Sequence, residues 1–283
     1  MFKKVLVAVD FSGPAMELLN AVTDLQHMGL EELVIVHVIR LEAAALGLST
    51  NRRKFLEKID QRKQQLEEQG LKVEVHQPVG KPSEEIKNLA EEEKVDLILI
   101  GSFGEGGLVR KLFLGSTVTE VIRSSKMPVL VEKYITKKGS LPQRMPIFEE
   151  GQPATALLAT DFSKSSIHIF DTFLEQPGYF QKVILYHVVD EGYTEEQINE
   201  NKQKAMARLE GWQSEFEERG FEVEKEVAVG VASDLIIKAS KKKHISILAI
   251  TRRGRSMVDE LMIGSTADQI VRRSVCPVLL LKN

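Results

Sequence analysis

The sequence is written twice, and this repeat constrains the fold more than any other feature. The segment KVLVAVDFS at 4–12 returns as TALLATDFS at 155–163. VDLILIGSFGEGGLVRKLFLGST at 95–117 returns as ISILAITRRGRSMVDELMIGST at 245–266. These and the other matched landmarks keep one order, with offsets of 149 to 151 residues. Self-similarity at a fixed offset is the signature of a repeated structural unit, so the chain is a tandem duplication.

The repeat also sets the boundaries of the parts. One module is expected at 1–133 and the second at 153–283. Between them, residues 134–152 (YITKKGSLPQRMPIFEEGQ) carry prolines, glycines and mixed charge without an apolar period. Such composition is typical of a connection. We therefore predict a linker that contains neither a strand nor a helix.

Within the first copy, apolar runs of strand length alternate with segments of helical period. Strands are expected at 5–9, 33–39, 71–77, 97–100 and 129–131. Helices are expected after Ser12, over 52–69 with Gly70 as the stop, from Pro82 with Ser83 as a cap, and over 115–125. Alternating strands and helices imply right-handed βαβ units and a parallel sheet. The predicted fold class is α/β: a three-layer α/β/α arrangement with an open, parallel five-stranded sheet, Rossmann-like and present twice.

Composition excludes several classes of protein. The 283 residues include 43% hydrophobic and 28% charged residues, which fits a globular protein with a substantial core. A net charge of −3 gives no broad basic field for nucleic acid and no polybasic membrane anchor. The single cysteine, Cys276, excludes an internal disulfide and a cysteine-based zinc site. The first apolar run is short and is read as a strand, and no run approaches the ~20 residues of a membrane span. We expect a cytoplasmic protein.

Two polar loops mark the expected ligand position. The first strand ends in VDFS at 9–12 and the fourth in GSFGEGG at 101–107. In an open parallel sheet, ligands bind beyond the carboxyl ends of the strands where the winding reverses. The helix that begins near Gly115-Ser116-Thr117 would point free amide groups and a positive dipole end into the same space. A glycine loop followed by a helix start is suited to phosphate, even without a Walker lysine.

These residues resemble a known family. The pattern G-x-x-G, then nine residues, then G-[ST], together with an early DFS and a late PVLV, is similar to that of the universal stress protein family. The resemblance covers nearly all of both copies and leaves only the linker. It implies an adenine nucleotide alpha hydrolase-like fold. It also implies that the glycine pattern holds the ribose and phosphates of ATP or AMP.

The resemblance further implies a set of nucleotide-binding positions. The strand-end aspartate and the residue after the histidine of the second strand would contact the adenine side. In the first copy the positions are Ala8, Asp10, Val38, Gly101, Gly104, Gly115, Ser116 and Thr117. In the second copy they are Asp161, Val188, Thr251, Gly254, Gly264, Ser265 and Thr266.

Each copy departs from the family pattern in its own way. Ten residues separate Gly104 from Gly115, one more than usual. The second copy has nine residues between Gly254 and Gly264, but its first glycine is replaced by Thr251. A β-carbon at that position would crowd the ribose unless the backbone stays extended.

Charge separates the two loops as well. The second loop carries Arg252, Arg253 and Arg255, whereas the first carries Glu105 among its glycines. We expect both copies to bind nucleotide, with unequal affinity for the longer phosphate chain.

Simpler roles exist for several of these residues. Asp10 and Asp161 are equally suited to capping the helices that follow them. Ser116 and Ser265 are suited to the same role. His37 and His187 lie within apolar strands, where a histidine is usually a core residue with a satisfied hydrogen bond. The sequence assigns no catalytic residue and predicts no metal site.

Three function classes follow. The first is an ATP- or AMP-binding protein of the stress response, in which nucleotide occupancy, with Mg²⁺ as an optional companion, reports the energy state to a regulatory protein partner. The second is a slow ATP hydrolase, and the third is a structural dimer that binds no nucleotide. The last strands, 129–131 and 278–280, are sheet edges. The resemblance implies that these edges pair as an intramolecular pseudo-dimer, and two chains would also be able to form a homodimer. Neither nucleic acid nor a membrane is an expected partner.

Overall fold

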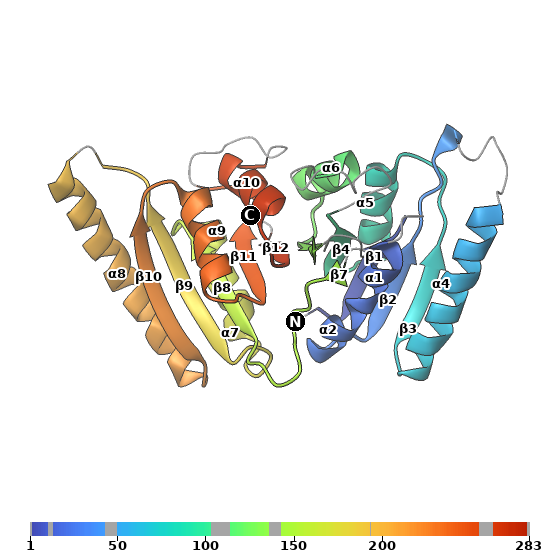
Figure 1. The fold of residues 1–283 in the computed structure, drawn as a ribbon, viewed down its shortest axis with the longest axis horizontal. Helices are drawn as coiled ribbons and strands as arrows, with labels where there is room; N and C mark the ends of the chain where they lie inside the picture. The colour runs from blue at the N-terminus through green and yellow to red at the C-terminus, as the bar shows by residue number, and fades with distance from the viewer. Residues whose placement is uncertain are drawn as a thin grey trace. The chain divides into compact units, whose positions relative to one another are not determined.

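The computed structural model describes residues 2–10, 14–42, 50–102, 114–135, 143–192, 194–254 and 263–281. The chain divides into two compact units, residues 2–144 and residues 145–283 (Figure 1). Each unit is described by itself below.

The first unit alternates strands and helices as expected. Its main elements are β1 (Lys4–Ala8), α1 (Pro14–Asn20), α2 (Val22–His27), β2 (Glu32–Val36), α4 (Thr50–Glu68), β3 (Lys72–His76), α5 (Pro82–Glu92), β4 (Leu97–Gly101), α6 (Ser116–Ser124) and β5 (Val129–Glu132). The second unit repeats the series with β8 (Thr155–Thr160), α7 (Lys164–Leu174), β9 (Lys182–Val189), α8 (Glu195–Glu218), β10 (Glu222–Val229), α9 (Ala232–Lys242), β11 (Ile247–Thr251), α10 (Ser265–Arg273) and β12 (Val278–Leu281).

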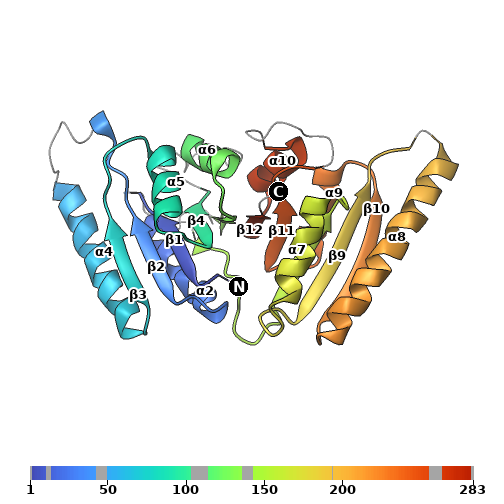
Figure 2. The same cartoon turned by 180° about the vertical axis from the view of Figure 1, so that it is seen from behind.

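Both sheets have the same topology. Within the first unit the strands follow the order β3-β2-β1-β4-β5, and within the second β10-β9-β8-β11-β12, with parallel pairing throughout. In the second unit, α9 lies in front of the sheet in Figure 1 and α7 lies in front of it in Figure 2, so helices cover both faces. The predicted α/β fold with a parallel five-stranded sheet in each half is confirmed.

The buried positions explain this arrangement. Every residue of β4 (LILIG) is buried, as expected for a central strand covered on both faces. On α4, Phe55, Ile59 and Leu66 are buried at helical spacing, and the surrounding residues are polar. Gly70 follows this helix with φ of +90°, a left-handed conformation that favours glycine. Gly70 therefore ends the helix, as predicted.

Two local predictions are wrong. The segment after Ser12 forms two short helices, α1 and α2, where one was expected; Ser12 itself lies outside the described residues. The residue before α5 is Lys81, and Pro82 occupies the first turn. Ser83 is therefore not a cap. It lies inside the helix, and its hydroxyl donates a hydrogen bond to Glu120 of α6, which joins the two helices.

The predicted linker is also more ordered than its composition indicated. Its first residues, Tyr134–Ile135 (β6), pair antiparallel with Gln143–Arg144 (β7). Arg144 Nη1 donates a hydrogen bond to Asp24 Oδ2 of α2 at 2.5 Å, and both side chains are largely buried. Burial alone would lower the pKa of Arg144, but the hydrogen bond and charge of Asp24 raise it. The start of the linker is thus an integral part of the first unit.

Among the helices of the segments given above, none is both long enough and apolar enough to cross a membrane.

Candidate functional site

A cavity of about 800 Å³ opens at the carboxyl ends of the strands in the second unit. This volume is typical of a small-molecule site. The strands β8 and β11 are neighbours, and the winding of the chain reverses between them. All seven nucleotide positions predicted for the second copy line the cavity: Asp161, Val188, Thr251, Gly254, Gly264, Ser265 and Thr266.

The loop after β8 holds Asp161 in place. Asp161 Oδ1 accepts a hydrogen bond from the amide of Ser163 at 3.0 Å. The residue that caps α7 is Ser163, whose hydroxyl accepts from the amide of Ser166. The capping role weighed for Asp161 therefore belongs to Ser163.

Gly254 lies directly opposite the aspartate. A β-carbon on Gly254 would be 3.0 Å from Asp161 Oδ2, closer than most contacts of this kind. Glycine at this position therefore leaves room between the strand-end acid and the loop of the fourth strand. This is the arrangement that a ligand needs to reach both.

The start of α10 provides donors at the other side of the cavity. The helix begins at Ser265, and Gly264 is its N-cap residue, with extended backbone and no side-chain capping bond. Ser265 is thus not the cap. Because amides of the first turn have no partners within the helix, they form an anion site together with the positive end of the dipole. Gly264 N donates to the carbonyl oxygen of Arg252 at 2.8 Å, which ties the helix start to the end of β11.

The cavity contains a buried cation. Arg252 is one of its lining residues, and only 5% of the residue is exposed. Burial, and then the charge of Arg253, lower the pKa of Arg252 to about 10. A guanidinium removed from water favours an anionic neighbour, since taking a charge out of water is costly. The local field is therefore suited to phosphate.

Thr251, which replaces the expected glycine, is accommodated by the strand. It is the last residue of β11 and pairs with Leu281, so its backbone is extended. Its hydroxyl donates to the carbonyl oxygen of Arg253 at 2.8 Å. The side chain is thus bonded to its own loop.

The two strand histidines are core residues with hydrogen-bond partners, as predicted. His187 Nδ1 lies 2.8 Å from the carbonyl oxygen of Thr160, and His37 Nδ1 lies 3.1 Å from that of Val9. Because a carbonyl oxygen only accepts, each Nδ1 donates. His187 also lines the cavity.

Sequence reasoning missed an aromatic and cationic wall of the cavity. Phe162 adopts φ of +60°, rare for a residue with a side chain, and its amide donates to Thr160 Oγ1 at 2.9 Å. Its ring lies 4.5 Å from that of His187, and Arg208 of α8 lies 5.1 Å from its centroid, within cation–π range. Lys204 of α8 also lines the cavity. The only available signal was the polar helix α8, whose inward residues cannot be placed before the fold is known.

The predicted positions of the first copy lie on equivalent elements. Ala8 ends β1 and pairs with Ile100 of β4, so Asp10, which follows β1, and Gly101, which ends β4, lie at the ends of neighbouring strands. Val38 follows β2. Gly115 is the N-cap residue of α6, and Ser116 and Thr117 form its first turn, so Ser116 is not the cap. Gly104 lies outside the described residues.

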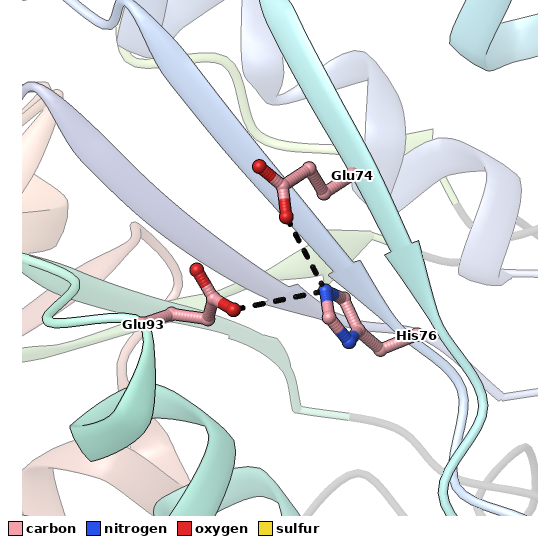
Figure 3. A group of neighbouring side chains, drawn as sticks. All are labelled: Glu74, His76 and Glu93. Carbon is pink, nitrogen blue, oxygen red and sulfur yellow. Dashed lines mark ion pairs between the residues drawn. The ribbon is translucent and has the colours of Figure 1, made fainter.

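One group of potential metal ligands occurs in the described part of the chain: Glu74, His76 and Glu93. Figure 3 shows the imidazole of His76 between the two carboxylates, with Nε2 at 3.6 Å from Glu74 and 3.9 Å from Glu93. Each carboxylate also forms an ion pair with a lysine. Lys72 Nζ lies 3.2 Å from Glu74 Oε1, and Lys4 Nζ lies 2.7 Å from Glu93 Oε2. The hydrogen bond from Lys72 lowers the pKa of Glu74.

The second unit contains an equivalent ion-pair cluster, in which lysine and glutamate side chains occupy different positions from those in the first unit. Lys243 contacts Glu224 and Glu226 at 2.7 and 3.2 Å, and Lys182 contacts Glu222 and Glu224. Lysines thus neutralise the acids in both units. The group around His76 is an ion-pair network at the surface of the sheet and is not suited to a metal ion.

The sequence matches the universal stress protein family over residues 1–133 and again over residues 154–282. The chain belongs to the universal stress protein family. It carries two modules of that family, as the repeat predicted.

Relatives of the family agree with this assignment. Universal stress protein MJ0577 of Methanocaldococcus jannaschii is 34% identical over 156 residues, covering 47% of this chain and 96% of the relative. Universal stress protein Slr1230 of Synechocystis is 30% identical over 184 residues, covering 65% of this chain and 57% of the relative. A universal stress protein structure from Archaeoglobus fulgidus is similar over 99% of this chain and 96% of its own, with a TM-score of 0.68. At 23% identity, that likeness shows the fold.

Proposed function

We propose that this universal stress protein binds an adenine nucleotide, ATP or AMP, in the cavity of the second module. The observation that carries the proposal is the meeting, in one cavity, of the buried Arg252, the uncapped start of α10 and the strand-end Asp161. The amides after Gly264 would hold phosphate, and Arg252 would offset its charge. Asp161 and Val188 would contact the ribose and adenine side.

The proposed cellular role rests on nucleotide binding, since we assign no catalytic residue among the residues that the structure describes. We propose that nucleotide occupancy is read by a protein partner as a report of stress or energy state. The cytoplasmic location and the pairing of the two modules remain predictions.

A slow ATP hydrolase is the second candidate. Asp190 and Glu191 also line the cavity, and phosphoryl transfer uses carboxylates to hold Mg²⁺. Release of phosphate from ATP, measured with and without Mg²⁺, separates the two candidates. A turnover that Asp190→Asn abolishes supports the hydrolase, whereas intact ATP recovered from the complex supports the binding protein.

The binding proposal is tested with the full chain. Isothermal titration with ATP and AMP is expected to give saturable binding that Arg252→Gln weakens at least ~10-fold, a loss typical of a charged contact to phosphate. The matched control is Arg219→Gln, because Arg219 is an exposed arginine at the end of α8 that is not among the cavity residues. Absence of binding by the wild-type chain would leave the structural dimer that binds no nucleotide as the remaining function class.

A further inference from the structure

The two modules differ in the ionisable residues that they bury at the carboxyl ends of their strands. In the second module, β11 is followed by the buried Arg252, whose counterpart in the first module is Ser102. In the first module, β5 ends in Glu132, which is fully buried and pairs with Gly101 of β4. The counterpart of Glu132 is Leu281. The second module therefore buries an arginine where the first has a serine, and the first buries a carboxyl where the second has a leucine.

The linker brings a side chain to the same place in the first module. Its first residue, Tyr134, lies against Gly101: the phenol oxygen is 3.1 Å from the position that a β-carbon on Gly101 would occupy. Burial, and then the charges of Glu132 and Asp10, raise the pKa of this phenol, which places it among those acids. Gly101 and Asp10 are two of the positions predicted to meet a nucleotide.

The linker is fastened where it covers these strand ends. Tyr134 pairs across the β6–β7 ribbon with Arg144, and Arg144 is held by Asp24 of α2 at 2.5 Å. β7 also packs beside α1. Moving Tyr134 away from Gly101 would therefore disturb a buried ion pair, and breaking such a pair is costly.

From this asymmetry we infer that the linker occupies the strand ends of the first module (Asp10, Gly101 and Glu132), so that each chain binds one nucleotide, in the second module. The inference rests on the proposed function and gives the two modules separate roles. A nucleotide brings several negative charges. At the first module it would meet the partly buried Asp10, the buried carboxyl of Glu132 and a fixed phenol, and none of these three groups offsets negative charge. At the second module it would meet a buried arginine.

The stoichiometry of binding tests this directly. Equilibrium dialysis of the full chain against radiolabelled ATP is expected to saturate at one ATP per chain. Two ATP per chain would overturn the inference and leave the proposed function standing. No bound ATP would overturn the proposed function itself.

Substitutions then show which module binds. Arg252→Gln is expected to weaken the single site at least ~10-fold. Arg208→Gln provides a second variant at an exposed position of the cavity wall, in case the buried substitution unfolds the module. Its matched control is Lys58→Gln, at the equivalent position of α4, which is expected to leave affinity unchanged. A single site that responds to Lys58→Gln and not to the second-module variants would overturn the inference.

Discussion

Replacing Glu132 by leucine should remove a pH-dependent loss of stability from the first module. Glu132 is completely buried, and burial raises the pKa of its carboxyl from 4.5 to about 8, although the nearby Arg144 acts in the opposite direction. Between these two pKa values the folded chain holds a proton on Glu132 that the unfolded chain releases. The contribution of this carboxyl to stability is therefore greatest below pH 4.5 and falls as the pH rises towards 8.

The size of the effect follows from this interval of about 3.5 pH units. A group protonated only in the folded state lowers the free energy of unfolding by about 1.4 kcal/mol per pH unit, or about 5 kcal/mol over the whole interval. Leucine is the residue at the equivalent position, Leu281, so the side chain suits this strand end. Glu132→Leu should make unfolding of the first module nearly independent of this carboxyl and should stabilise it most at pH 8.

The single tryptophan makes the assay specific. Trp212 belongs to the second module, so urea unfolding followed by its fluorescence reports that module, while far-UV circular dichroism reports both. Glu132→Leu should shift the part of the dichroism transition that comes from the first module and should leave the Trp212 fluorescence transition unchanged. Glu92→Gln, at an exposed site, should shift neither transition. Equal pH slopes for wild type and Glu132→Leu between pH 5 and 8 would refute the reasoning.

Three further substitutions test the fold and the site. Arg144→Gln should destabilise the first module by about 3–5 kcal/mol in urea unfolding, because it leaves Asp24 buried without its cation; a change below 1 kcal/mol would mean that the linker is not fastened there. Gly254→Ala should weaken ATP binding several-fold in calorimetric titration, because the new β-carbon lies 3.0 Å from Asp161 Oδ2, and unchanged affinity would contradict this geometry. Gly211→Ala, in the exposed interior of α8 with nothing within 4 Å of the new atom, should leave ATP affinity unchanged and stabilise the second module by about 0.5–1 kcal/mol. A lower midpoint of the fluorescence transition would count against that last expectation.

The fold was predictable because its signals are local and occur twice. Apolar runs such as 97–100 are long enough to identify buried strands, and the equivalent run in the second copy forms a strand as well. The position of the cavity followed from topology alone, since parallel strands place their carboxyl ends at one edge.

Contacts between distant segments were not predictable in the same way. The linker reads as a polar connection, and its order depends on Asp24, which lies 120 residues before Arg144. The capping role expected for Ser83 failed because its hydroxyl bonds to Glu120 of another helix. Arg208 gave no signal either, because a cation on a polar helix is usually solvated, and only the fold places it over Phe162.

The hydrogen bond from the amide of Gly264 to the carbonyl oxygen of Arg252 holds together the two ends of the segment between these residues. Adding one residue to a closed loop of this size costs only about 0.1 kcal/mol of closure entropy. An insertion would therefore leave the start of α10 where it is. Natural variation or a protein engineer is therefore free to lengthen this segment without redesigning the helix that follows it.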